Sequence, residues 1–295
     1  MDIEGWSATP DLNDIYQDIR ALGLESNLAE LEAYGFTVVK DALTPDETDY
    51  FRSRILEITE ERIGKPLDLE TETDYKDLGF IPYLLYKDRA FKKSVTNPKT
   101  LTLITYLLGK RCILSSLGCH LKGPGGQGLL LHSDTGNGVP DPFPPYSQVA
   151  NCNYALTDYT EENGALAMVP GSHRMARQPT ASEKGLSGNE RNPHVIPIEV
   201  PAGSAIIWHG NTWHGSFPRA KPGLRVNLSN FYCREYIQPQ EDYRNTVPAD
   251  FLEEADDRLA SLLGADLAHG WTEEGPLKLF ERRSKAAAEV RSWYN

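Results

Sequence analysis

The feature that most constrains the fold is a series of short apolar runs between about residues 110 and 235, each bounded by Gly, Pro, Asn or Asp. The runs are CILSSLGCHL, QGLLLHSD, VANCNYAL, GALAMVPG, PIEVPAGSAIIW, TWHGSF and LRVNLSNFYC. Many short apolar segments separated by regular turn signals are typical of the strands of a β-sandwich or barrel. The sequence therefore predicts a β core in this region.

Helical patterns flank this core on both sides. They cover residues 11–34, 44–63, 249–263 and 277–293. Gly23 is expected to interrupt the first pattern. The second begins with Thr44 as a cap, followed by Pro45 in the first turn, and is expected to end at Gly64.

A short strand over residues 35–39 is expected between the first two helices, and a polar loop over residues 66–78. The predicted fold is mainly β (α+β), with a β core at about 110–235 and helical flanks at 11–64 and 249–293. We expect one domain over residues 1–295, because β-barrels of this length often form a single unit.

Composition excludes several classes of protein. The chain has a formal charge of −12, which disfavours a nucleic-acid partner because such binders use basic patches. No apolar stretch approaches the ~20 residues of a membrane span, and the acidic N-terminus does not resemble a signal peptide. Its four cysteines form no C-x-x-C pair and are expected to be buried, reduced thiols. Together these features predict a cytoplasmic protein with no membrane partner, and they leave its oligomeric state open.

The pair His132 and Asp134 is the sharpest local candidate for a metal site. The two follow the apolar run LLL, and residues i and i+2 of a strand point to the same face. Two histidines and one carboxylate form the facial triad of non-haem iron oxygenases, which leaves positions open for a co-substrate and O2. His209 and His214 compete as the third ligand. Their spacing does not choose between them, because a turn at 210–211 would change the alternation.

A second group of residues is suited to binding a carboxylate. Arg225 lies eleven residues beyond His214, after a turn rich in Pro and Gly. A hairpin at this turn would place His214 near Arg225 across two antiparallel strands. Arginine can grip a carboxylate through two parallel hydrogen bonds, and Ser216 would add a hydroxyl on the face of His214. A metal beside such a clamp is suited to a chelating keto-diacid.

At these residues the sequence resembles the phytanoyl-CoA dioxygenase family. The similar segments are HSD at 132–134, ENGALAMVPGSH at 162–173 and WHGSFPRAKPGLR at 213–225, with GFTVVKDALTPDE at 35–47 resembling the family's usual start. The resemblance implies a double-stranded β-helix (jelly-roll) core. It implies His132, Asp134 and His214 as ligands of Fe(II), and Arg225 with Ser216 as the group that binds 2-oxoglutarate. His209 then either has a structural role or supports the metal ligands without binding the metal, and His173 has a structural role.

The activity implied by the resemblance is that of an Fe(II)- and 2-oxoglutarate-dependent dioxygenase. With O2 as the other co-substrate, such an enzyme hydroxylates an unactivated C–H bond of a small organic or acyl substrate and releases succinate and CO2. Asn153 departs from the large aromatic residue common at its position. It is either a hydrogen-bonding partner of the co-substrate, the interpretation that we favour, or a core residue. The presence of Asp134 disfavours halogenation, because related halogenases replace this acid with a small residue.

Two other functions are compatible with parts of the pattern. One is a zinc-dependent hydrolase or isomerase with the same ligands, which would leave Arg225 unexplained. The other is a binding module that has lost its metal, which the complete ligand set disfavours. The motif G-x-G-x-x-G at 123–128 leads into an apolar run and not into a helix, so we interpret it as a loop and not as a dinucleotide site.

The substrate is not evident from the sequence. Five aromatic residues either line a largely apolar pocket or belong to the core, and they are Tyr83, Tyr86, Phe143, Tyr146 and Tyr232. The proline-rich segment 138–146 follows the HSD motif directly, so it could line the pocket's mouth.

Overall fold

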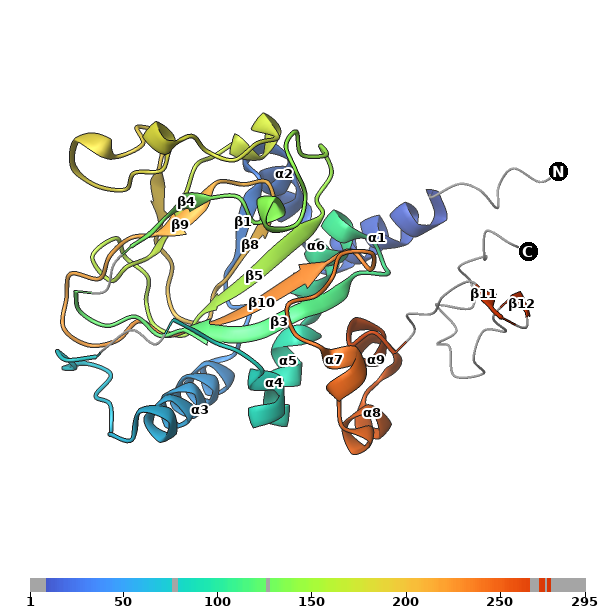
Figure 1. The fold of residues 1–295 in the computed structure, drawn as a ribbon, viewed down its shortest axis with the longest axis horizontal. Helices are drawn as coiled ribbons and strands as arrows, with labels where there is room; N and C mark the ends of the chain where they lie inside the picture. Colours follow the sequence, from blue (N-terminus) through green and yellow to red (C-terminus); the bar gives the residue numbers. More distant parts are fainter. Residues whose placement is uncertain (1–8, 76–78, 126–127, 266–270, 274, 277–295) are drawn as a thin grey trace.

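The predicted β core is present as two antiparallel sheets. The structure, a computed structural model, describes residues 9–75, 79–125, 128–265, 271–273 and 275–276 (Figure 1). The larger sheet has the strand order β1-β8-β5-β10-β3-β2, and the smaller sheet has the order β4-β9-β6-β7. Their bounds are β1 Phe36–Val39, β2 Phe80–Ile81, β3 Ile113–His120, β4 Leu129–His132, β5 Val149–Ala155, β6 Leu166–Met168, β7 Ile196–Ile198, β8 Ala205–His209, β9 His214–Ser216 and β10 Asn227–Cys233.

The central strands of the larger sheet are covered on both faces. Every residue of β5 is buried. Cys152 and Tyr154 point to one face and belong to the main apolar core, whereas Asn151 and Asn153 point to the other face and line a cavity. A strand whose side chains alternate in this way separates a hydrophobic layer from a polar site. The larger sheet is therefore both the wall of the core and the floor of the cavity.

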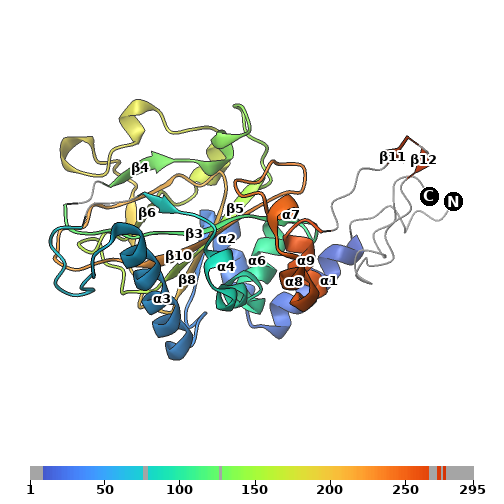
Figure 2. The same cartoon turned by 60° about the horizontal axis from the view of Figure 1, so that its bottom comes forward.

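Helices cover the core-facing side of this sheet (Figure 2). Those before the β core are α1 Thr9–Ala21, α2 Glu25–Tyr34, α3 Pro45–Ile63, α4 Leu84–Lys87, α5 Lys92–Val95 and α6 Pro98–Leu108. Thr44 and Glu47 form a capping box at the start of α3, and Gly64 ends it in the left-handed conformation. The predicted break at Gly23, strand at 35–39 and helix ending at Gly64 are all confirmed.

The C-terminal flank differs from its prediction. Instead of one helix over 249–263, the structure has α8 Ala249–Glu254 and α9 Asp257–Leu262, preceded by a short α7 at Tyr243–Thr246. The break occurs because Asp256 takes an extended conformation and caps α9 through the backbone N–H of Leu259. A short pair of strands follows, β11 Trp271–Thr272 and β12 Gly275–Pro276. The helix expected over 277–293 lies outside the described residues.

The two sheets face each other, as Figure 1 shows for β4 and β9 beside β5 and β10. Side chains from both line one cavity of about 290 Å³. The smaller sheet contributes residues of β4, β6 and β9, and the larger sheet contributes residues of β2, β3, β5, β8 and β10. This is the jelly-roll arrangement that was expected, and the candidate site lies between its two sheets.

Candidate metal centre

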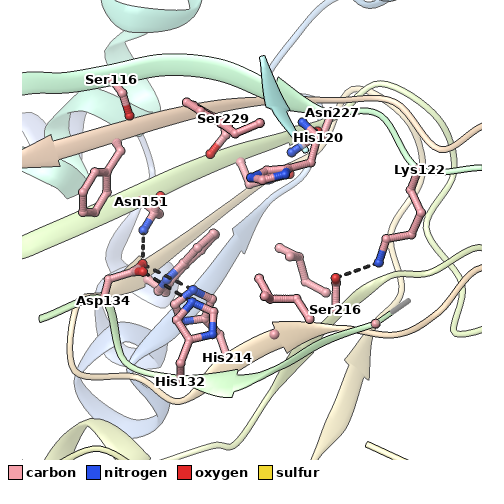
Figure 3. Close-up of a pocket in the computed structure, with 18 of the residues that line it drawn as sticks. Ser116, His120, Lys122, His132, Asp134, Asn151, His214, Ser216, Asn227 and Ser229 are labelled. Carbon is pink, nitrogen blue, oxygen red and sulfur yellow. Dashed lines mark hydrogen bonds and ion pairs between the residues drawn. The ribbon is translucent and has the colours of Figure 1, made fainter. Parts of the chain in front are cut away.

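His132, Asp134 and His214 come together at one point of this cavity. One potential ligand atom from each lies within 4.8 Å of the others. Nε2 of His132 is 3.5 Å from Oδ1 of Asp134, and Nε2 of His214 is 3.3 Å from Oδ2 of the same carboxylate. Figure 3 shows the three side chains converging. Among the residues that the structure describes, this is the only group of three or more His, Cys, Asp or Glu side chains able to hold a metal ion.

The local backbone explains how His132 and Asp134 reach the same side. β4 ends at His132, and Asp134 is the first residue of a 3-10 turn over Asp134–Asn137. The sequence suggested that both residues lie on one strand, but only His132 does. Ser133 between them is still extended (φ −112°, ψ 132°), so the alternation of side chains persists for one more step. Its hydroxyl donates to the carbonyl of Gly210, which ties this turn to the β8–β9 connection.

The hydrogen bonds of both histidines direct the Nε2 atoms to the centre. Nδ1 of His132 lies 2.9 Å from the carbonyl oxygen of Leu130, and Nδ1 of His214 lies 3.0 Å from that of Thr212. A carbonyl only accepts, so each Nδ1 carries the hydrogen and each Nε2 presents a lone pair. Burial lowers the pKa of His214 to about 4 despite the opposing charge of Asp134. His214 is therefore neutral at neutral pH, which suits a metal ligand.

Asn151 orients the carboxylate. Its side-chain Nδ2 donates to Oδ2 of Asp134 at 2.6 Å. Burial raises the pKa of Asp134, but the neighbouring His214, His132 and Asn151 outweigh burial and lower it to about 2. The carboxylate is thus ionised and held in one orientation, with Oδ1 on the side of His132.

The remaining candidate histidines lie outside the centre. His209 is buried, and its Nδ1 accepts from the backbone N–H of Asn211. Burial and the neighbouring His173 lower the pKa of His209 to about 3, so its ring is neutral. The His173 ring lies 5.5 Å from it, centroid to centroid. These contacts are those of core residues, as predicted for both.

A cationic end of the cavity is built by Lys122 and Arg225. The Lys122 ammonium donates to the hydroxyl of Ser216 at 2.7 Å and to the carbonyl of Phe217 at 2.8 Å, and Figure 3 shows the first contact. The Arg225 guanidinium donates to the carbonyls of Gly164 and His120 and lies over the Tyr159 ring. Both cations are buried, at 4% and 2% exposure, so this end of the cavity favours an anion.

The expected hairpin between His214 and Arg225 is wrong. His214 is on β9 of the smaller sheet, whereas Arg225 precedes β10 of the larger sheet and pairs with Lys122 in an isolated bridge. The connection at 217–226 crosses from one sheet to the other, because its Pro and Gly residues do not continue the β9 ladder. Ser216 and Arg225 nevertheless line the same cavity, from opposite walls.

Asn153 also lines the cavity, as predicted. Its Oδ1 accepts a hydrogen bond from the Tyr159 hydroxyl at 3.0 Å. Of the two alternatives left open for the aromatic candidates, pocket or core, the structure excludes this cavity. None of Tyr83, Tyr86, Phe143, Tyr146 and Tyr232 lines this cavity, nor does any described residue of 138–146; its aromatic walls are Phe80, Trp208 and Phe231. Tyr232 points instead into the core beneath the sheet, because it alternates with Phe231 along β10.

Sequence reasoning missed Lys122 and Asn151. Lys122 follows an apolar strand directly, and a lysine so placed is usually exposed. The only local signal for Asn151 was the repeat Asn-Cys-Asn at 151–153, which puts two amides on one face of a strand. Neither role was evident until both sheets were in place.

Comparisons with known proteins identify the family. The sequence model of the family described as phytanoyl-CoA dioxygenase (PhyH) matches residues 31–226. The chain belongs to the phytanoyl-CoA dioxygenase family. Among its relatives is the dioxygenase af480 of Aspergillus fumigatus, 25% identical over 272 residues that cover 90% of this chain and 84% of the relative. Another is the ectoine dioxygenase of Stutzerimonas stutzeri, 24% identical over 86% of this chain and 88% of that protein.

Solved structures share the fold. HygX from Streptomyces hygroscopicus, with nickel and 2-oxoglutarate bound, has a TM-score of 0.58 at 16% identity over 73% of this chain and 88% of its own. EctD from S. alaskensis, with 2-oxoglutarate and 5-hydroxyectoine, has a TM-score of 0.57 at 20% identity over 71% of this chain and 76% of its own. The family match and the dioxygenase relatives show that this chain is a dioxygenase. Within the part of the chain that the structure describes, no helix is long and apolar enough to cross a membrane.

Proposed function

We propose that this dioxygenase depends on Fe(II) and 2-oxoglutarate, and that His132, Asp134 and His214 hold the iron. The observation that carries the proposal is the convergence of two Nε2 lone pairs and one ionised carboxylate within 4.8 Å. Two imidazoles and one carboxylate are the donor set of non-haem iron oxygenases. The relatives support the choice of metal and co-substrate, since HygX was solved with iron and with 2-oxoglutarate.

The cationic end fits the far carboxylate of 2-oxoglutarate. Ser216 lies two residues beyond His214 on β9, a separation of about 7 Å along a strand. That distance suits an extended five-carbon diacid whose other end is at the triad. The Nε atom of Arg225 is buried and has no hydrogen-bond partner among the described residues. Such an orphaned donor is costly unless a ligand satisfies it.

We infer the following roles for the side chains. Lys122, Arg225 and Ser216 bind the far carboxylate, and Asn153 contacts the co-substrate from β5. Asn151 keeps Asp134 oriented, and the backbone carbonyls of Leu130 and Thr212 keep both imidazoles in the tautomer that binds metal. When bound, Fe(II) and 2-oxoglutarate would supply the electrons that activate O2, so that one oxygen atom enters a C–H bond of the substrate and the other enters succinate. The protein positions the substrate's C–H bond and excludes water.

The first experiment tests metal and co-substrate together. Metal-free protein receives Fe(II) and 2-oxoglutarate without oxygen, and the visible spectrum is recorded. A bidentate keto-acid on Fe(II) is expected to give a weak charge-transfer band. We expect the band in the wild type and its loss in Asp134→Ala and His214→Ala. A band that persists in these variants contradicts the ligand assignment, and its absence in the wild type contradicts the cofactor assignment.

A second experiment tests the clamp. Lys122→Gln and Arg225→Gln each remove a buried cation, and a hydrogen bond to a charged group contributes about 1.5–3 kcal/mol. We expect the 2-oxoglutarate concentration for half-maximal band intensity to rise about 10- to 100-fold, with Fe(II) affinity unchanged. Lys221→Gln is the matched control, since Lys221 pairs with Glu162 at the surface. If both clamp variants need the same 2-oxoglutarate concentration as the wild type, the co-substrate binds elsewhere.

A further inference from the structure

The cavity has two chemically different ends, and the proposed sites of iron and 2-oxoglutarate leave part of the second end for a substrate. Lys122 and Ser216 lie at one end in Figure 3, whereas Ser116, Asn151 and Ser229 gather at the end near the triad. Phe231 and Gln240 complete the lining of that second end. The first end carries positive charge and suits a dianion; the second offers hydroxyl and amide groups beside an aromatic ring.

The strand register produces this division. On the cavity face, Phe231 of β10 pairs with Ser116 of β3 and with Asn151 of β5. Ser229, two residues along, pairs with Gly118 and Asn153. The last pair along the same direction is Lys122 with Arg225. Successive rows on one face of a sheet are about 7 Å apart, so the neutral and cationic rows lie well apart.

Gln240 is fixed at the neutral end. Its backbone N–H donates to the Ser115 hydroxyl at 3.0 Å, and the backbone N–H of Glu241 donates to the Ser115 carbonyl at 2.8 Å. The register of β3 and β10 shifts next to this point, as in a β-bulge, a feature common next to active sites. The buried Glu241 carboxylate then accepts from the backbone N–H groups of Tyr83 and Leu117. Gln240 is therefore part of the cavity wall.

These contacts determine which groups remain for a ligand. The Ser116 hydroxyl donates to Oε1 of Gln240 at 2.8 Å, which leaves the Nε2 amide as the donor that Gln240 can offer. Asn151 uses Nδ2 for Asp134, so its Oδ1 is the acceptor that it can offer. The neutral end therefore presents a donor from Gln240, an acceptor from Asn151 and the Ser229 hydroxyl, all beside the Phe231 ring.

The charge of this end restricts the substrate. Among the described residues that line the cavity, basic side chains are confined to Lys122, Arg225 and the histidines His120, His132 and His214, and the only acid is Asp134. Near Ser116, a substrate carboxylate or phosphate would therefore meet no lysine or arginine among these described residues, and an ammonium group would meet no acid among them other than a metal ligand. A plain alkyl chain would desolvate the Ser229 and Gln240 groups without replacing their hydrogen bonds, which is unfavourable.

We propose that the part of the substrate that enters this site is an uncharged, oxygen-bearing organic group: an alcohol, ether or carbonyl on a ring or short chain. It contacts Ser229 and Gln240 by hydrogen bonds and Phe231 by its apolar face. Rejection of acyl-CoA thioesters, free acids and amines follows from the same lining. This inference rests on the proposed function, because it treats the cationic end as occupied by 2-oxoglutarate.

The test uses the full chain loaded with Fe(II) and 2-oxoglutarate without oxygen. Binding next to the metal is followed through the perturbation of the charge-transfer band. The probes are trans-1,2-cyclohexanediol, cyclohexanecarboxylate, cyclohexylamine and hexanoyl-CoA. The first three are cyclohexanes that differ only in their substituents. We expect the diol to bind at least about tenfold more tightly than each of the others, because a ligand that leaves buried polar groups unpaired is strongly disfavoured.

Variants assign the binding to the neutral end. Ser229→Ala and Gln240→Leu each remove one hydrogen-bonding group, and we expect each to weaken diol binding about fivefold, as for loss of one neutral hydrogen bond. Gln238→Leu is the matched control, because Gln238 lies two residues away on the same segment but does not line this cavity. Equal diol affinity in Gln240→Leu and Gln238→Leu would overturn the assignment.

The outcomes separate this inference from the proposed function. If the band forms but the carboxylate, the amine or hexanoyl-CoA binds as tightly as the diol, or no probe perturbs it, the neutral-substrate proposal fails and the cofactor proposal stands. If no band forms in the wild type, the cofactor proposal itself fails.

Discussion

At the scale of single residues, the role of Asn151 gives a prediction about metal affinity. Asn151→Leu keeps the number and branching of the side-chain heavy atoms but removes the hydrogen bond to Asp134, and loss of such an outer partner typically costs about 10- to 100-fold in metal affinity. We expect a drop of this size when metal-free protein is titrated with Co(II). Asn153→Leu is the control for metal affinity alone, since Asn153 is on the same face but bonds to Tyr159. Equal affinity in the two variants would show that the hydrogen bond does not position Asp134.

His209 gives a residue-scale prediction about pH. Burial and the neighbouring His173 lower the pKa of His209 from 6.5 to about 3, so between these values the unfolded chain binds a proton that the native chain does not. Stability conferred by neutral His209 is therefore present above about pH 6.5 and is lost as the pH falls. We expect urea titrations to show that His209→Asn reduces the loss of unfolding free energy between pH 7 and 5 by about 2 kcal/mol. The control is His194→Asn, at an exposed position, which should lose as much unfolding free energy between pH 7 and 5 as the wild type does. If His209→Asn also loses as much as the wild type, buried His209 is not the cause of the pH dependence.

At the scale of elements, the close approach of β4 to β9 sets the distance between the two metal-binding histidines. His132 pairs with His214 in this ladder, and a Cβ on Gly215 would lie 2.2 Å from the carbonyl oxygen of Leu129. Gly215→Ala therefore forces the strands apart, at a cost of about 1–3 kcal/mol as for other overpacked sites. We expect both a lower midpoint of thermal unfolding and weaker Co(II) binding. The control is Gly138→Ala, where a Cβ would meet no heavy atom within 4 Å, and it should change neither the unfolding midpoint nor Co(II) binding. Normal Co(II) binding in Gly215→Ala would show that the approach of β4 to β9 does not set the distance between the histidines.

The elements also show what a sequence can and cannot predict. The β core and α3 were predictable, because alternation, capping and glycine stops act within a few residues. His132 and Asp134 were predictable as a pair, since only an extended Ser133 separates them. The hairpin assumed for Arg225 was wrong because membership of a sheet depends on contacts between distant strands. Gln240 gave no local signal, since its place depends on a hydrogen bond to Ser115, on a strand far earlier in the chain.

At the scale of the whole molecule, the main apolar core links both flanks to the β sheet. It contains Ile15 of α1, Tyr154 of β5 and Leu262 of α9, so we propose that the chain folds as one domain, as the sequence predicts for residues 1–295. A shared core predicts one cooperative transition. The chain has five tryptophans, of which Trp208 and Trp213 lie in or beside strands of the two main sheets. In a variant with Trp6, Trp271 and Trp293 replaced by Phe, tryptophan fluorescence reports on the sheets, whereas far-ultraviolet circular dichroism at 222 nm reports largely on the helices. We expect the two signals to give the same urea midpoint in the metal-free protein. Separate midpoints would mean that the helices fold independently of the sheets that carry the site.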